Sequence, residues 1–341
     1  MQGSMVPEFV STDMLNSAIA KLEKSGEQEL GTGDSRLREA VATALPRLVG
    51  AEAAKMSGAD ADCLIVGNAP DELIFSLVTC YGNLERGIML DGGAQTCALV
   101  HATILNRSIE SYPRRDDLSI DEDGFIARAE EVDPMAIFIS NPGDPMADAL
   151  DLGFVERLLQ RTDAVVVVDE TLAVAAPRTA ARLVGSHANL CVVRSLTYAH
   201  PVAGFQIAYG IASPEIARKV RSDLTYHPVD TITQAIGVEI CENLGKFEGF
   251  ERSLFMRRGY LVERLRKLSS CKVFESASDF VLVEISDADR ARAILKRDFG
   301  IALDPLEGLE LSRRCLKVPV RGDDDNISLI DALAQCLIQG C

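Results

Sequence analysis

The sequence contains no tryptophan, few aromatic residues and few positive charges, and these shortages narrow the possible functions. Lysine and arginine total 35 against 51 aspartate and glutamate residues, which gives a net charge of −16. A chain this acidic argues against nucleic acid and anionic membranes as partners, because both require a basic face. No apolar run reaches the roughly 18 residues of a transmembrane helix, and the first residues predict no signal sequence.

The nine cysteines show no pairing pattern. An odd number of cysteines without a C-x-x-C motif predicts reduced, mostly buried thiols in a cytoplasmic protein. The four histidines suggest no metal site, because we find no metal-ligand spacing among them or with cysteine; they are His101, His187, His200 and His227.

Apolar runs alternate with amphipathic helical patterns over the first two thirds of the chain. The predicted strands lie at residues 63–66, 87–90, 136–139, 164–168 and 190–193. This rhythm, rich in aliphatic residues and poor in aromatic ones, predicts an α/β fold whose mostly parallel sheet is covered by helices on both faces.

The pattern changes after about residue 235. A long helical stretch over 236–268 precedes predicted strands at 272–274, 280–284 and 316–320, with helices at 288–299 and from 326. This order predicts a smaller C-terminal α+β domain at 236–341. Residues 46–235 then form the large domain, and we expect the N-terminal segment 1–45 to join the small one.

Polar residues directly follow three of the predicted strands. Asn141 follows one strand, Asp169 the next, and the segment 194–198 the third. Ligands of parallel α/β sheets gather at the carboxyl ends of the strands. The pattern therefore predicts one shared site.

Three segments follow these predicted strands or span their ends; they read S-N-P-G-D-P at 140–145, V-V-V-V-D-E at 165–170, and R-S-L-T-Y-A-H-P-V-A-G-F-Q-I-A-Y-G at 194–210. Together they resemble the class I/II aminotransferases, especially the histidinol-phosphate aminotransferase branch. The family patterns are roughly S/C-N-P-N-N-P-T-G, V-D-E-A-Y and R-T-L-S-K-A-F-G-L-A-G-L-R-L-G-Y. The resemblance implies fold type I of the pyridoxal phosphate (PLP)-dependent transferases, which usually form dimers.

The resemblance also implies roles for cofactor-binding residues. Asp169 matches the aspartate that keeps the pyridine nitrogen protonated, so that the ring can act as an electron sink. Asn141 matches the asparagine that bonds to the phenolic oxygen. The expected phosphate-binding positions are Asn68, Ala69, Ser195, Thr197 and Gln206.

The lysine that anchors PLP in the family has no counterpart. Tyr198 stands at its position, and the chain contains no lysine between Lys55 and Lys219. A phenol cannot form an imine, and with a pKa near 10 it is a poor base unless strongly perturbed. We therefore expect PLP or pyridoxamine phosphate (PMP) to be bound without a covalent bond, or no cofactor at all.

Other positions depart from the family as well. Gln206 replaces the phosphate-binding arginine, and Lys317 falls where an arginine would grip the substrate carboxylate. Lysine attracts a carboxylate only as a point charge, without the guanidinium fork. Asp279 stands at a position that is usually asparagine, and Tyr226 matches a loop aromatic near the substrate.

His200 has two interpretations. It fills an aromatic packing position of the family, or it acts with Tyr198 as a general acid or base, since histidine titrates near neutral pH.

The sequence is compatible with three functions. The first is a diverged enzyme that acts on a small amino-acid-like molecule. The second is a noncatalytic subunit that forms a homodimer or pairs with a homologue. The third is a module that binds a small ligand in the inherited cleft.

Overall fold

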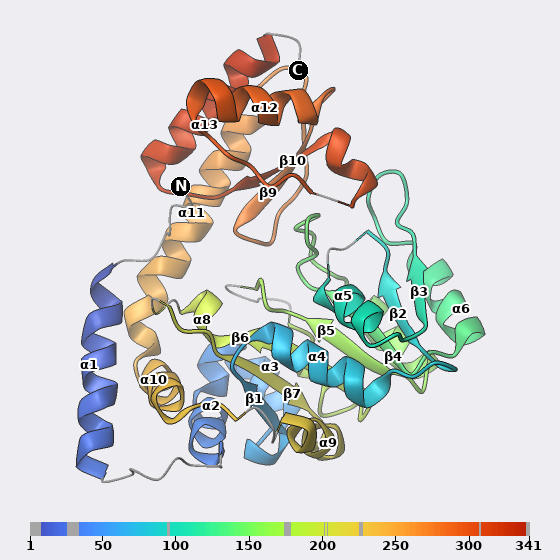
Figure 1. The fold of residues 1–341 in the computed structure, drawn as a ribbon, viewed down its shortest axis with the longest axis vertical. Coiled ribbons are helices and arrows are strands. Elements are labelled where there is room, and N and C mark those ends of the chain that lie inside the picture. The colour runs from blue at the N-terminus through green and yellow to red at the C-terminus, as the bar shows by residue number, and fades with distance from the viewer. Residues whose placement is uncertain are drawn as a thin grey trace. The chain divides into compact units, whose positions relative to one another are not determined.

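The computed structural model describes residues 8–25, 34–93, 96–173, 179–200, 202, 204–224, 228–306 and 308–338. The chain forms two compact units (Figure 1). The larger unit comprises Val6–Asn141 and Leu150–Phe247, and the smaller comprises Pro142–Ala149 and Glu248–Cys341.

The larger unit is built on a seven-stranded sheet with the order β1-β7-β6-β5-β4-β2-β3. β7 runs antiparallel to both of its neighbours, and the other strand pairs are parallel. This mixed, mostly parallel α/β sheet confirms the predicted fold class. The strands are β1 (Leu64–Gly67), β2 (Ile88–Asp91), β3 (Ile109–Tyr112), β4 (Ala136–Ser140), β5 (Val165–Asp169), β6 (Leu190–Ser195) and β7 (Ala208–Ala212).

Helices cover both faces of this sheet, which is why its central strands β4, β5 and β6 each begin with a run of at least four apolar residues. In β5, Val166 and Val168 belong to one core cluster, whereas Val165 and Val167 belong to the other. A strand buried on both faces reads as a continuous apolar run. One face is covered by α4 (Pro70–Tyr81), α5 (Cys97–Ile104) and α9 (Pro214–Leu224). The other is covered by α2 (Ser35–Leu48), α6 (Glu122–Val132), α7 (Leu152–Arg161) and α10 (Thr231–Glu242).

The N-terminal helix α1 (Glu8–Ser25) lies against α10 in the larger unit. Lys21 Nζ donates to carboxylate oxygens of Glu239 and Glu242, both at 2.6 Å. The grouping of residues 1–45 with the small domain stays a prediction. The pairing of Lys21 with α10 spans more than 200 residues and has no local signal in the sequence.

One continuous helix over 236–268 is not present. The chain forms α10, a short 3-10 turn at Leu244–Phe247 and then α11 (Glu248–Leu265). Asn243 ends α10 and its Nδ2 donates to the Glu239 carbonyl at 3.0 Å. Asn243 and Gly245 disfavour helix continuation, which accounts for the break.

The smaller unit contains a three-stranded antiparallel sheet with the order β10-β9-β8, as the C-terminal strand pattern predicts. Its strands are β8 (Lys272–Val273), β9 (Phe280–Glu284) and β10 (Cys315–Pro319), and its helices are α11, α12 (Ala288–Phe299) and α13 (Asp323–Ile338). Within the described ranges of the whole chain, no helix is long and apolar enough to cross a membrane.

Candidate functional site

The predicted strand-end residues of the larger unit lie at one edge of the sheet. β4 pairs with β5 through Ser140 and Asp169, and β5 pairs with β6 through Asp169 and Val193. Asn141 therefore follows its strand beside Asp169, and its backbone N–H donates to the Asp169 carbonyl at 2.8 Å. Ser195 ends β6 next to them.

A buried network behind this edge holds Asn141. Its Nδ2 donates to Glu170 Oε1 at 3.1 Å, and its Oδ1 accepts from the backbone N–H of Leu150 at 3.1 Å. Glu170 has no exposed surface and also accepts from Arg194 Nη1 and Thr179 Oγ1, each at 2.6 Å. Glu170 was not among the predicted site residues, although an acidic residue directly after the buried strand β5 needs a partner.

Asp169 remains partly exposed at the end of β5. Its Oδ1 accepts from the backbone N–H of Thr171 at 3.0 Å. It lies close enough to Cys97 that burial of the thiol, followed by the charge of Asp169, raises the pKa of Cys97. Asp169 thus ends β5 with part of its surface exposed, and its role toward a pyridine nitrogen stays a prediction.

The hydroxyls of the expected phosphate site support the backbone around Tyr198. Ser195 Oγ caps the short helix α8 (Leu196–Ala199) by accepting from the Tyr198 N–H at 3.0 Å. Thr197 Oγ1 accepts from the backbone N–H of Ile207 at 3.0 Å. Each hydroxyl still has one proton to donate. Tyr198 itself is half-buried.

The start of α4, the other half of the expected phosphate site, already interacts with a carboxylate. Glu72 Oε2 accepts from the Asn68 N–H at 2.7 Å. Ala69 caps the helix without a side-chain hydrogen bond, and Pro70 follows at the first helical position, where it has no N–H to offer. Gln206, at the family's arginine position, is exposed.

His200 is packed in the core. Its side chain is 6% exposed, and its Nδ1 lies 2.9 Å from the carbonyl oxygen of Leu196. The ring stands edge-on to Phe247 with 5.1 Å between centroids. Burial lowers the pKa of His200 to about 4, so the imidazole is neutral at pH 7. These contacts favour the packing interpretation.

Four lysines of the larger unit have described side chains, and all four are exposed: Lys21, Lys55, Lys219 and Lys246. Lys21 pairs with α10, and Lys219 Nζ lies 3.9 Å from the ring centroid of Tyr81. None of these four directly follows β4, β5 or β6 in the sequence.

In the smaller unit, Lys317 is paired with a carboxylate. Its Nζ lies 2.5 Å from Asp144 Oδ1 and 4.4 Å from the ring centroid of Phe280. Burial raises the pKa of Asp144 despite Lys317, and the nearby charges of Asp304 and Asp279 act in the same direction. Lys317 therefore balances local acidic groups. Tyr226 lies outside the described residues.

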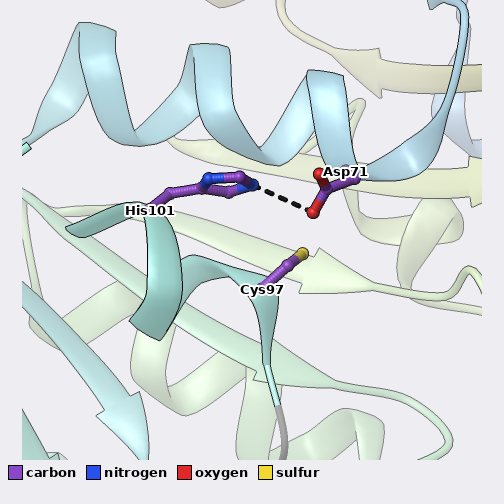
Figure 2. A group of neighbouring side chains, drawn as sticks. All are labelled: Asp71, Cys97 and His101. Atoms are coloured by element: carbon purple, nitrogen blue, oxygen red, sulfur yellow. Dashed lines mark hydrogen bonds and ion pairs between the residues drawn. The ribbon is translucent and has the colours of Figure 1, made fainter. Parts of the chain in front are cut away.

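The structure also brings together three residues that were not predicted to lie close to one another. Figure 2 shows Cys97 and His101 reaching from α5 toward Asp71 on α4. One ligand atom from each lies within 4.8 Å of the others. The signal was present in the sequence, because positions i and i+4 of a helix share one face. The expectation that histidine and cysteine lack metal-ligand spacing overlooked this pair.

Comparison with known proteins agrees with this fold. The family model "Aminotransferase class I and II" matches residues 7–333. The histidinol-phosphate aminotransferase of Thermoanaerobacter pseudethanolicus is 26% identical over 293 residues, covering 84% of this chain and 81% of the relative.

Two solved histidinol-phosphate aminotransferase structures share the fold. The one from Clostridium acetobutylicum has a TM-score of 0.84 at 15% identity and covers 99% of this chain and 98% of that one. The one from Sinorhizobium meliloti, in complex with pyridoxal-5'-phosphate, has a TM-score of 0.79 at 20% identity and covers 99% and 90%. With a family match over nearly its whole length, this chain belongs to the class I and II aminotransferases.

Proposed function

We propose that this protein does not perform ordinary transamination and is instead a diverged enzyme that acts on a small amino-acid-like molecule. The observation that carries the proposal is Tyr198, which lies in α8 and which the motif resemblance aligns with the anchoring lysine. The exposure of the described lysines of the larger unit supports it, because no lysine side chain among them lies at the strand ends.

The residues present do not fit a covalently anchored PLP. The pyridine end has a suitable partner in Asp169, which is partly exposed. The phosphate end is poor, because Glu72 already accepts the Asn68 N–H and Gln206 carries no charge. A dianion beside a carboxylate gains little from the remaining hydroxyls and the helix start. Any PLP or PMP is therefore bound without a covalent bond, and the protein works without cofactor if neither binds.

Borohydride reduction followed by intact-mass measurement tests the missing anchor. After incubation with PLP and reduction, the wild-type chain should keep its unmodified mass. Tyr198→Lys places an amine at the family's position and should gain one reduced cofactor, whereas Tyr198→Phe, the matched control, should gain none. A wild-type chain that carries one cofactor on a specific lysine would overturn the proposal.

Noncovalent binding is tested separately by titration with PLP and PMP, read by absorbance and thermal shift. Saturable binding that is lost in Asp169→Asn would establish the pyridine contact. Absence of binding by either form would leave the cofactor-free form of the proposal.

A noncatalytic subunit, as a homodimer or paired with a homologue, is the second candidate. It is supported by the packing of His200 against Phe247 and by the pairing of Lys317 with Asp144, since neither side chain is free to act on a substrate. A panel of amino acids and keto acids decides between the two. The enzyme requires turnover that falls in Tyr198→Phe, and the noncatalytic subunit requires none.

A further inference from the structure

Two helices on the same face of the larger sheet place three unlike donor groups together. Asp71 lies in the first turn of α4, and Cys97 and His101 lie one turn apart on α5. Thr96 Oγ1 accepts from the Ala98 N–H at 3.2 Å and so caps the start of α5 at Cys97. The cluster is thus built from ordered helix termini.

We propose that Asp71, Cys97 and His101 bind a divalent transition-metal ion, with zinc(II) the best match. The proposal goes beyond the proposed function, since it assigns a metal ion to the larger unit and requires neither PLP nor turnover.

The distances between the three donor atoms are close to those of a zinc site, so metal binding requires only a small movement of the side chains. His101 Nε2 lies 2.9 Å from Asp71 Oδ1, and all three donor atoms lie within 4.8 Å of one another (Figure 2). Zinc bonds of about 2.0–2.3 Å at tetrahedral angles separate ligand atoms by roughly 3.3–3.7 Å. Asp71 is the side chain that can move, because it is 63% exposed, whereas His101 is 13% exposed.

The imidazole is already oriented. The ring of His101 stands edge-on to Phe75, with centroids 5.1 Å apart and an interplanar angle of 81°. Phe75 lies one turn after Asp71, so the same face of α4 supplies both a ligand and the ring that positions another ligand. Such support reduces the entropy lost on metal binding.

The donor set selects the metal. One thiol, one imidazole and one carboxylate suit zinc, whereas magnesium and calcium prefer oxygen ligands alone. Three protein ligands leave the fourth tetrahedral position for water or a substrate atom, as in catalytic zinc sites.

Metal titration of the full chain tests the site. After dialysis against a chelator, we expect calorimetry to show one zinc ion per chain. Cobalt(II) should produce the near-ultraviolet sulfur-to-metal absorption that marks a thiolate ligand. Magnesium should bind at least about 100-fold more weakly than zinc, given its preference for oxygen ligands.

Single substitutions assign the ligands. Removing an outer-shell partner of a metal site already costs about 10–100-fold in affinity, so Cys97→Ala and His101→Ala should each weaken binding by about 100-fold or more. Asp71→Asn changes an exposed side chain without changing its shape, so it tests the site even if a cysteine or histidine variant folds poorly.

Cys80→Ala is the matched control, because Cys80 lies near the other end of α4 with its Sγ near the Lys219 carbonyl. It should bind zinc as the wild type does. Wild-type affinity in both Cys97→Ala and Asp71→Asn, or no saturable zinc binding at all, would overturn the proposal.

Discussion

Glu170 and Arg194 form an ion pair that is almost completely removed from water. Their side chains are 0% and 3% exposed, and Arg194 Nη1 lies 2.6 Å from Glu170 Oε2. Burying two charges is costly, so a pair like this one is stable only when further hydrogen bonds satisfy the remaining lone pairs and protons. Thr179, the Ala180 N–H and Asn141 supply them.

Neutralising one partner of this pair should strongly destabilise the larger unit. Glu170→Gln leaves the Arg194 charge buried without compensation, which should lower the free energy of unfolding by about 3–5 kcal/mol. Urea denaturation measures the change. The control is Asp133→Asn, in a pair with Arg86 whose members are 45% and 62% exposed, and it should cost at most about 1 kcal/mol. Equal losses in the two variants would contradict the argument.

His200 should make stability depend on pH in a definite window. Its pKa is about 4 in the folded protein against 6.5 for the free side chain, because burial disfavours the charged form. Between these values the unfolded chain binds a proton that the folded chain does not. The free energy of unfolding should therefore fall as the pH decreases from about 6.5 to about 4, by up to about 1.4 kcal/mol per pH unit.

Comparison of the wild type with His200→Phe isolates this contribution, since carboxylates titrate in both proteins. The aromatic replacement keeps a ring against Phe247, and it should remove the extra slope between pH 4 and 6.5. If the free energies of unfolding of the two proteins instead diverged between pH 6.5 and 8, His200 would titrate near neutral pH, as acid–base chemistry requires.

At the scale of elements, α10 and α2 approach closely because α10 carries a glycine at the contact. A Cβ atom on Gly237 would lie 2.6 Å from Leu37 Cδ1 and 3.1 Å from Ile207 Cδ1. Gly237→Ala should therefore cost about 1–3 kcal/mol through overpacking, although alanine favours a helix. Thermal or urea denaturation measures the cost.

Gly259 provides the matched control in α11. It is exposed and a Cβ there meets nothing within 4 Å. Gly259→Ala should stabilise the protein by up to about 1 kcal/mol through helix propensity alone. If Gly237→Ala were equally stabilising, close packing of α2 on α10 would not be the reason for the glycine.

The elements differ in how far the sequence predicts them. The central strands are predicted because burial on both faces leaves uninterrupted apolar runs, as in β4 and β5. β3 and β7 were missed. β3 lies at the sheet edge with all of its residues at least partly exposed, and β7 consists of A-Y-G-I-A, whose alanines and glycine have low strand propensity.

Only the location of the candidate site could be predicted from the sequence. Strand ends place Asn141 and Asp169 together, but their partners come from elsewhere in the chain. Asn141 bonds to Glu170, 29 residues away, and Lys317 pairs with Asp144, 173 residues away. Such pairings depend on tertiary packing, so the predicted roles of Asn141 and Lys317 could not include the groups that already bind them.

At the scale of the whole molecule, the net charge of −16 opposes the compact state through self-repulsion. Salt shortens the Debye length from about 30 Å at 10 mM to about 8 Å at 150 mM. The thermal midpoint should therefore rise between these NaCl concentrations, in the wild type and in Cys97→Ala alike, because screening does not depend on one thiol.

Zinc should add a second stabilisation of a different kind. A ligand that binds only the folded state stabilises it by about 2.7 kcal/mol at 100 times its Kd. At 150 mM NaCl, where screening is largely complete, micromolar zinc should raise the midpoint in the wild type but not in Cys97→Ala, and magnesium at the same concentration should raise it in neither. Equal shifts from zinc and magnesium would mean that both cations act only by neutralising acidic surface. A shift confined to zinc and to chains with Cys97 would instead locate the cation at the ends of α4 and α5, where this chain has acidic groups and a thiol.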